Sequence, residues 1–266
     1  MQSIADRLNR FGTWLPGVEQ DALWVGAPLR VHRRCDRLMF EVSNRIAYDN
    51  LMVFGTGEPS RPDLLTRNTW LHVPAMPSGD KWNPADGRYV LATLDLVRSR
   101  MRDRMNVELL DSGDDPPDWA TDDRSKAAEL KRRVAEAVFV VSPFKAVVDG
   151  LRQALGGRLP SSLKRLGTVH TTQGKEAEIV IVVLGTATDG NGSRVWASET
   201  PNLLNVAITR AKRRLVIVGD HSNWSRQRNF SVLAGYCRGN ADPLLTRVDA
   251  LDWSVGVSAD WSRYDS

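Results

Sequence analysis

The sequence predicts an α/β fold in which a doubly wound parallel sheet carries helices on both faces. Three short apolar runs, at 137–141, 179–184 and 215–218, are rich in Val and Ile, and each ends in a turn or loop signal. Such runs are typical of buried parallel strands. Amphipathic stretches of helical period at 144–155 and 203–214 alternate with them. The order strand, helix, strand, helix, strand indicates a sheet covered on both sides.

Three further elements complete the expected sheet and its cover. A helix is expected at 36–48, with Asp36 placed to cap its N-terminus. Short strands are expected at 70–74 and 167–170, where the sequence is again rich in β-branched or aromatic residues.

Two segments interrupt this pattern. Residues 76–88 and 111–126 are rich in Pro, Gly and Asp, which disfavours regular structure, so we expect surface loops or insertions there. One domain with these insertions is expected over 28–238. Residues 239–266 show little periodic pattern and are expected to form a C-terminal tail.

Length and charge limit the class of protein. The 266 residues can bury one substantial core, and we favour one domain over two small ones. The net charge is +4 and the pI about 9.3, and Arg is much commoner than Lys. Guanidinium groups suit bidentate contacts to phosphate oxygens, so this composition permits nucleic-acid binding.

The cysteines and the N-terminal sequence exclude other classes. Cys35 and Cys237 form no CxxC or Cys/His spacing, so neither a disulfide framework nor a metal site is expected. The first residues carry charges and no long apolar stretch. We therefore expect a soluble, cytoplasmic protein without a membrane partner.

The richest polar motif lies in 167–184, where a polar turn separates two predicted strands. Ligands of open parallel sheets sit at the carboxyl ends of the strands. The hydroxyls of Thr171 and Thr172 could hold a nucleic-acid phosphate, Gly174 permits close backbone approach, and Glu176 could accept from a sugar hydroxyl. A turn with a solvated Lys/Glu pair would explain the same residues, and the spacing alone leaves both interpretations open.

A second motif lies in 201–220, where a predicted helix with a basic end runs into a buried strand; the basic residues are Arg210, Lys212, Arg213 and Arg214. An arginine near the end of such a helix can stabilise a transferring phosphoryl group, and Arg210 is our candidate. The alternative is a basic run that merely solvates the helix end and complements its dipole. Asp220 is interpreted as the N-cap of a following helix.

A third motif is the basic turn that precedes the helix expected at 36–48. Arg33 and Arg34 could reach a phosphate from this turn. Without further context, the cluster of arginines here is more typical of a solvated basic face.

The fourth motif lies in 138–151, where a buried strand ends in Ser142 and a helix follows. Ser suits the cap of that helix. The functional alternative is that Ser142, with neighbouring amides and Lys145, holds a backbone phosphate at the helix N-terminus.

Taken in this order and spacing, the four segments resemble the C-terminal RecA-like motor domain (2A) of superfamily 1B helicases. This group includes the RNA helicase of nonsense-mediated decay and RecD-like DNA helicases, within the AAA-type P-loop NTPase superfamily. VHRR at 31–34 resembles the family's QYR-type motif, and VVSPF at 140–144 its ITPY-type motif. HTTQGKE at 170–176 resembles motif V, and NVAITRAK at 205–212 motif VI. The resemblance covers about residues 28–220 and implies a RecA-like fold.

The resemblance also implies roles for single residues. In that family one arginine of the QYR-type motif and the first arginine of motif VI contact the γ-phosphate, which gives these roles to Arg34 and Arg210. The residues implied beside the nucleotide are Gln173, Gly174, Lys175 and Glu176. Those implied on the nucleic-acid side are Ser142, Lys145, Thr171 and Thr172. His32 departs from the family's Gln, and because an imidazole can be charged near pH 6 to 7, its role stays open.

The sequence contains no G-x-x-x-x-G-K-[ST] motif and no apolar strand that ends in paired acids. ATP with Mg²⁺ is the implied cofactor, held mainly by an N-terminal RecA-like domain of the same protein to which residues 1–27 would be the linker. We therefore expect the isolated chain to bind ATP poorly and not to hydrolyse it.

The favoured function is the C-terminal motor half of an ATP-dependent helicase that moves 5′ to 3′ on single-stranded nucleic acid, with DNA favoured over RNA. The alternative is a non-catalytic RecA-like module that binds nucleic acid or a partner protein. A domain that feeds a strand to a nuclease or defence activity is a third, weaker hypothesis.

Overall fold

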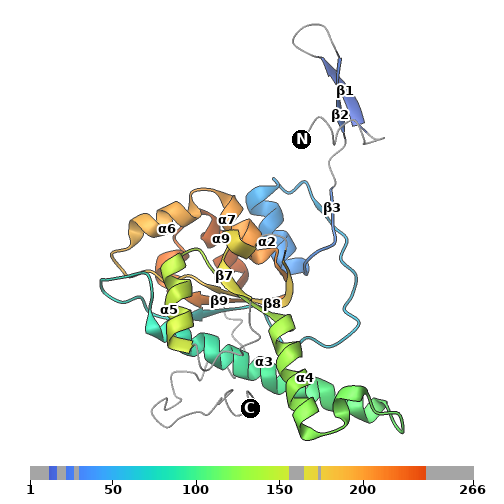
Figure 1. Cartoon of the computed structure of the whole chain (residues 1–266). Coiled ribbons are helices and arrows are strands. Elements are labelled where there is room, and N and C mark those ends of the chain that lie inside the picture. The colour runs from blue at the N-terminus through green and yellow to red at the C-terminus, as the bar shows by residue number, and fades with distance from the viewer. Residues whose placement is uncertain (1–11, 17–21, 27–29, 156–164, 173–174, 238–266) are drawn as a thin grey trace.

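The computed structural model describes residues 12–16, 22–26, 30–155, 165–172 and 175–237. Its centre is a five-stranded sheet, all parallel, with the order β5-β9-β8-β6-β7 (Figure 1). The strands are β5 (Thr69–His72), β6 (Val138–Ser142), β7 (Leu166–Thr168), β8 (Ala177–Val183) and β9 (Ala211–Gly219).

Helices cover both faces of this sheet (Figure 1). On one face α2 (Arg37–Ala47), α6 (Asn191–Ser198), α7 (Pro201–Ile208) and α9 (Arg228–Cys237) contact one another. On the other, α3 (Pro84–Asp111) contacts both α4 (Asp123–Ala137) and α5 (Lys145–Leu155). The predicted α/β fold, a doubly wound parallel sheet with helices on both faces, is confirmed.

The central strands form where the sequence is most apolar. Every residue of β6 is buried, and β8 is buried except at Glu178. The two strands pair in parallel, with Phe139 opposite Val180. Because helices shield both faces, a continuous Val/Ile run is stable here where an alternating strand would bury polar side chains.

Smaller elements surround the domain. The strands β1 (Gly12–Pro16) and β2 (Ala22–Gly26) form an antiparallel hairpin, and β3 (Val31–His32) pairs in parallel with β4 (Val53–Phe54). Short helical turns are η1 (Asp118–Ala120), η2 (His170–Thr172) and α8 (His221–Trp224). In the described part of the chain, no helix combines the length and apolarity that a membrane crossing requires.

The long helix α3 was not predicted from the sequence, and it begins at Pro84, within a segment expected to be a loop. Asn83 caps it, since its side chain accepts from the amide of Ala85 at 3.0 Å, and Pro suits the first helical position. Its buried residues lie all around the first turns, against the sheet and two helices. A helix packed on several sides shows no single apolar face, so its period is hidden. The other expected loop, 111–126, likewise contains η1 and the start of α4.

The helix predicted over 203–214 is wrong at its C-terminal end. α7 ends at Ile208, and the chain enters β9 at Ala211, which pairs with Ala177 of β8. A long-range strand pairing thus overrides local helical period. The predicted N-caps at Asp36 and Asp220 are confirmed, since Asp36 accepts from the amide of Arg37 and Asp220 from that of Asn223.

Candidate functional site

The chain between β7 and β8 crosses the sheet from one end of its strands to the other. It leaves β7 beside the carboxyl end of β6, where Thr168 lies opposite Ser142, and enters β8 at Ala177, at the amino ends. The five residues of β6 separate these ends by about 13 Å, at about 3.3 Å per residue. The expectation of one polar site at the carboxyl ends is therefore wrong, because the crossover divides the motif at 170–176 between both ends.

At the amino ends, three basic side chains converge on the residues just before β8. Arg34 Nε lies 3.2 Å from Glu176 Oε2, and Lys212 Nζ lies 2.5 Å from Glu176 Oε1. Arg210 donates from Nη1 to the carbonyl oxygen of Lys175 at 3.3 Å. We call Arg34, Lys175, Glu176, Arg210 and Lys212 the amino-end cluster. Arg34 and Arg210, more than 170 positions apart in the sequence, meet in this cluster.

Within the amino-end cluster, Glu176 is held as a carboxylate. The hydrogen bond from Lys212 lowers its pKa most, burial opposes this, and the charges of Lys212 and Arg34 lower the pKa further. Of its two cationic partners, Arg34 makes the longer contact with Glu176 and is therefore the more easily exchanged.

Arg210 is the least satisfied member of the cluster. It is 5% exposed, and its Nε has no hydrogen-bond partner among the described residues. Burial lowers its pKa, and repulsion from Arg34 lowers it further, against attraction from Glu176. A buried guanidinium with a free donor and a second cation beside it is a strong attractant for an anion.

His32 shapes the turn that presents Arg34. Its Nε2 accepts from the backbone amide of Cys35 at 3.2 Å and lies 2.9 Å from the Cys35 sulfur. Burial lowers the pKa of His32, and the charge of Arg34 lowers it further. The lowered pKa favours the neutral imidazole, whose Nε2 can accept from the Cys35 amide.

The basic run after Arg210 separates into two groups. Lys212 joins the amino-end cluster, whereas Arg213 and Arg214 turn to acids elsewhere in the chain. Arg213 Nε donates to Asp63 at 2.8 Å, and Arg214 Nη1 donates to Asp36 at 3.0 Å. The solvated-basic-end interpretation is thus wrong for these two arginines, which tie β9 to the segments before α2 and β5.

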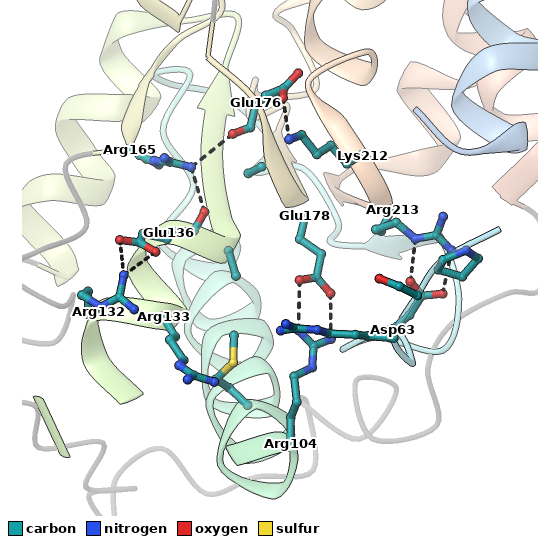
Figure 2. A pocket seen from close by; sticks show the side chains of 16 residues that line it. Asp63, Arg104, Arg132, Arg133, Glu136, Arg165, Glu176, Glu178, Lys212 and Arg213 are labelled. Carbon is teal, nitrogen blue, oxygen red and sulfur yellow. Dashed lines mark hydrogen bonds and ion pairs between the residues drawn. The ribbon is translucent and has the colours of Figure 1, made fainter. Parts of the chain in front are cut away.

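A charged groove of about 750 Å³ adjoins the cluster and shares Glu176 and Lys212 with it (Figure 2). It lies at the amino ends of β6, β8 and β9, and α3 and α4 supply part of its wall. Its charges are largely paired within the chain, and Arg104 contacts Glu178 with two nitrogens, at 2.9 and 3.1 Å. The groove was not predicted, because the helices that wall it were not.

Arg165 is a further contributor that the sequence did not single out. Lying just before β7, it donates from Nη1 to the carbonyl oxygens of Glu136 at 2.7 Å and Glu176 at 3.1 Å (Figure 2). It thereby joins the starts of three strands and fixes the backbone of Glu176. No local pattern around Arg165 signals this role.

The residues expected on the nucleic-acid side lie at the opposite end of the strands. Ser142 is fully buried at the end of β6, and its Oγ accepts from the amide of Phe144 at 3.1 Å, in the turn just before α5 begins at Lys145. Thr171 is exposed and donates to the carbonyl oxygen of Thr168 at 3.0 Å, and Lys145 is exposed. Thr172 ends η2 with an undescribed side chain, and Gln173 and Gly174 lie outside the described residues.

Comparison with known proteins finds similarity to an AAA domain and to helicases. Residues 123–222 match a family model described as an AAA domain. The chain is 29% identical over 115 residues to the DNA polymerase alpha-associated DNA helicase A of Saccharomyces cerevisiae, covering 42% of this chain and 16% of that protein. The helicase of the same name in Schizosaccharomyces pombe is 36% identical over 86 residues, covering 32% of this chain and 12% of the relative. The chain thus spans a small part of each relative's length, and these matches support a helicase-type P-loop NTPase family for the region that carries Glu176 and Arg210.

Proposed function

We propose that this chain is the C-terminal motor half of an ATP-dependent superfamily 1B helicase. Residues 28–238 would form its second RecA-like domain, 1–27 the connection to an N-terminal RecA-like domain, and 239–266 a tail. The observation that carries the proposal is the convergence of Arg34 and Arg210 on the segment at 175–176, where Nε of Arg210 has no partner within the described part of the chain.

In this proposal the two guanidinium groups act on the γ-phosphate of an ATP that is bound mainly by the N-terminal domain. Arg34 would leave Glu176 for the phosphate, while Lys212 keeps Glu176 ionised to accept from a sugar hydroxyl. Charge that develops on the transferring phosphoryl group would then face Arg34 and Arg210 in a dry site. ATP would draw the two domains together and hydrolysis would release them.

The residues present fit the phosphates of ATP better than they fit Mg²⁺. Glu176 is the carboxylate of the cluster, and two cations already hold it. Among the described residues, no group of three or more His, Cys, Asp or Glu side chains is arranged to hold a metal ion. We therefore assign Mg²⁺ coordination to the N-terminal domain, with this chain supplying positive charge across the cleft.

The single-stranded nucleic acid, with DNA favoured over RNA, would bind at the carboxyl ends of the strands. Thr171, Thr172, Lys145 and the backbone around Ser142 are the proposed contacts there. The nucleotide and the nucleic acid would occupy opposite ends of one sheet. Because the β-strands between them are rigid, closure around ATP can alter the grip on the nucleic acid. Alternating grips would give 5′ to 3′ translocation, and contacts made mainly to phosphates would weaken with salt.

The test uses the complete protein, in which this chain follows its N-terminal motor domain, together with the 266-residue chain alone. Arg210→Ala and Arg34→Ala are each expected to lower the strand-stimulated kcat for ATP by about 10³-fold or more, as arginine fingers do. Arg33→Ala, an exposed neighbour of Arg34, is the matched control and is expected to retain kcat. The chain alone is expected to show no turnover.

Two outcomes would refute the proposal. One is wild-type kcat in the complete protein that carries Arg210→Ala. The other is turnover by the isolated chain that this substitution abolishes. Salt-dependent strand binding by a complete protein without ATP turnover would instead favour a non-catalytic interaction module.

A further inference from the structure

Trp196 is half exposed at the end of a row of packed aromatic rings. It lies on α6, which follows the carboxyl end of β8, and is 52% exposed. Its ring centroid lies 5.9 Å from that of Phe144, and Phe144 lies 6.4 Å from Trp224, which lies 4.7 Å from Phe230. The other three rings are buried. Trp196 is therefore the solvent-facing end of an otherwise buried row.

The helix that carries Trp196 is fixed rigidly to the sheet. The neighbouring Arg194 is buried and donates to Thr186 Oγ1 at 3.3 Å, to the carbonyl oxygen of Ala187 at 2.7 Å and to that of Thr188 at 2.9 Å. Thr186 itself has a φ of 76°, a left-handed conformation that is strained for a β-branched residue. These contacts hold the loop after β8 and the first turn of α6 in one arrangement, so the indole has a fixed place.

One lysine lies beside the aromatic row, and a second lysine follows Phe144 in the chain. Lys81 Nζ lies 5.6 Å from the centre of the Phe144 ring, and the carbonyl oxygen of Lys81 accepts from the amide of Thr186 at 2.8 Å. This approach requires Gly185, because a Cβ there would overlap the Lys81 carbonyl group. Lys145 follows Phe144 directly and is exposed. The ring against which Trp196 packs, that of Phe144, thus has one lysine over it and a second, exposed lysine next to it in the chain.

We infer that Trp196 is a stacking platform for a base of the single-stranded nucleic acid, with Lys81 and Lys145 facing the adjacent phosphates. This inference rests on the proposed function, and it adds a base contact to a surface otherwise expected to hold phosphates. A basic surface with an exposed aromatic ring binds single strands without sequence preference, since every base has a π-face. A protein partner would need a larger apolar patch than this ring and Val195 offer.

The test compares two fluorescent oligonucleotides of roughly 12 nucleotides, one with bases and one abasic, titrated with the full 266-residue chain. Trp196→Ala is expected to weaken binding of the base-bearing strand by about 5- to 100-fold, which corresponds to the loss of one stacked base. Binding of the abasic strand is expected to stay unchanged, as is the slope of affinity against salt concentration, because the phosphate contacts persist.

Two further variants separate stacking from packing. Trp196→Phe retains a ring and is expected to keep most of the affinity. Trp196→Leu retains apolar packing against Phe144 without a π-face and is expected to bind as Trp196→Ala does. Leu110→Ala removes an apolar side chain that is 80% exposed at the end of α3 and should leave both strands bound as in the wild type.

Three results would overturn the inference. They are an affinity of Trp196→Ala for the base-bearing strand within twofold of wild type, an equal loss for both oligonucleotides, and wild-type binding by Trp196→Leu. Failure of the strand binding that the proposed function requires looks different, because the wild-type chain would then bind neither oligonucleotide in a salt-dependent manner.

Discussion

The buried carboxyl group of Asp86 allows the pH dependence of stability to be worked out from the structure. Asp86 lies in the first turn of α3, is 1% exposed, and neither of its oxygens has a hydrogen-bond partner among the described residues. Burial raises its pKa from 3.8 to about 7, and the negative charge of Asp220 contributes to the increase. The folded protein therefore binds a proton at Asp86 over a pH range in which the unfolded chain has lost it.

The sign and size of the effect follow from this difference. Below about pH 4 the carboxyl group is protonated in both states, and the contribution of Asp86 to the free energy of unfolding is at its maximum. As the pH rises from about 4 to about 7, the free energy of unfolding falls by about 1.4 kcal/mol per unit, and above about pH 7 it levels off. The difference of about 3 units between 7 and 3.8 corresponds to at most about 4 kcal/mol. Between pH 5 and pH 8 the expected loss is about 3 kcal/mol.

The assay is urea unfolding of wild type and Asp86→Asn at pH 5 and pH 8. The amide of Asn introduces its own unpaired groups, but these cost the same at both pH values, so the change between pH 5 and pH 8 isolates the charge. Wild type is expected to lose about 3 kcal/mol more than the variant over this range. Asp95→Asn serves as a comparison, since the pKa of Asp95 is raised less, to about 6. Parallel pH profiles for wild type and Asp86→Asn would refute the reasoning.

Three further predictions concern a glycine in a tight loop, the two buried thiols and an ion pair. Gly185→Ala is expected to lower the free energy of unfolding by at least about 1–2 kcal/mol, because the φ of Gly185 is 58°; Gly192→Ala, on an open helix surface, is expected to be neutral or stabilising, and equal melting temperatures for the two variants would contradict this. Burial raises the pKa of both Cys35 and Cys237 to about 12, so neither thiol should react with a disulfide reagent at pH 8 until the chain is denatured; rapid reaction of the folded protein would be the opposite result. Arg104→Ala should cost about 1–3 kcal/mol in urea unfolding, because it leaves a partly buried carboxylate on β8 without its partner; a change below about 0.5 kcal/mol would disagree.

The amino-end cluster shows how far sequence motifs can place a site. Arg34, Glu176 and Arg210 each belong to a different motif that resembles a family motif. In the structure Arg34 and Arg210 both contact the segment at 175–176, which contains Glu176. Their partners were less predictable. Lys212 reaches Glu176, whereas Arg213 turns to Asp63, although a local reading of the basic run gives these neighbours the same role. The alternation of side chains along β9 separates them, and that strand exists only through its pairing with β8.

The sequence by itself determined the central strands, because continuous apolar runs of four to six residues rich in Val and Ile, at 137–141, 179–184 and 215–218, are stable in a sheet that is shielded on both faces. It also determined the caps at Asp36 and Asp220, which depend on contacts within three residues. Only the tertiary structure decided where α7 gives way to β9, that α3 is helical, and that the motif at 170–176 is split across the sheet. These features rest on contacts between residues distant in sequence. Such contacts bury apolar surface that the local sequence pattern does not reveal, so they override local preference.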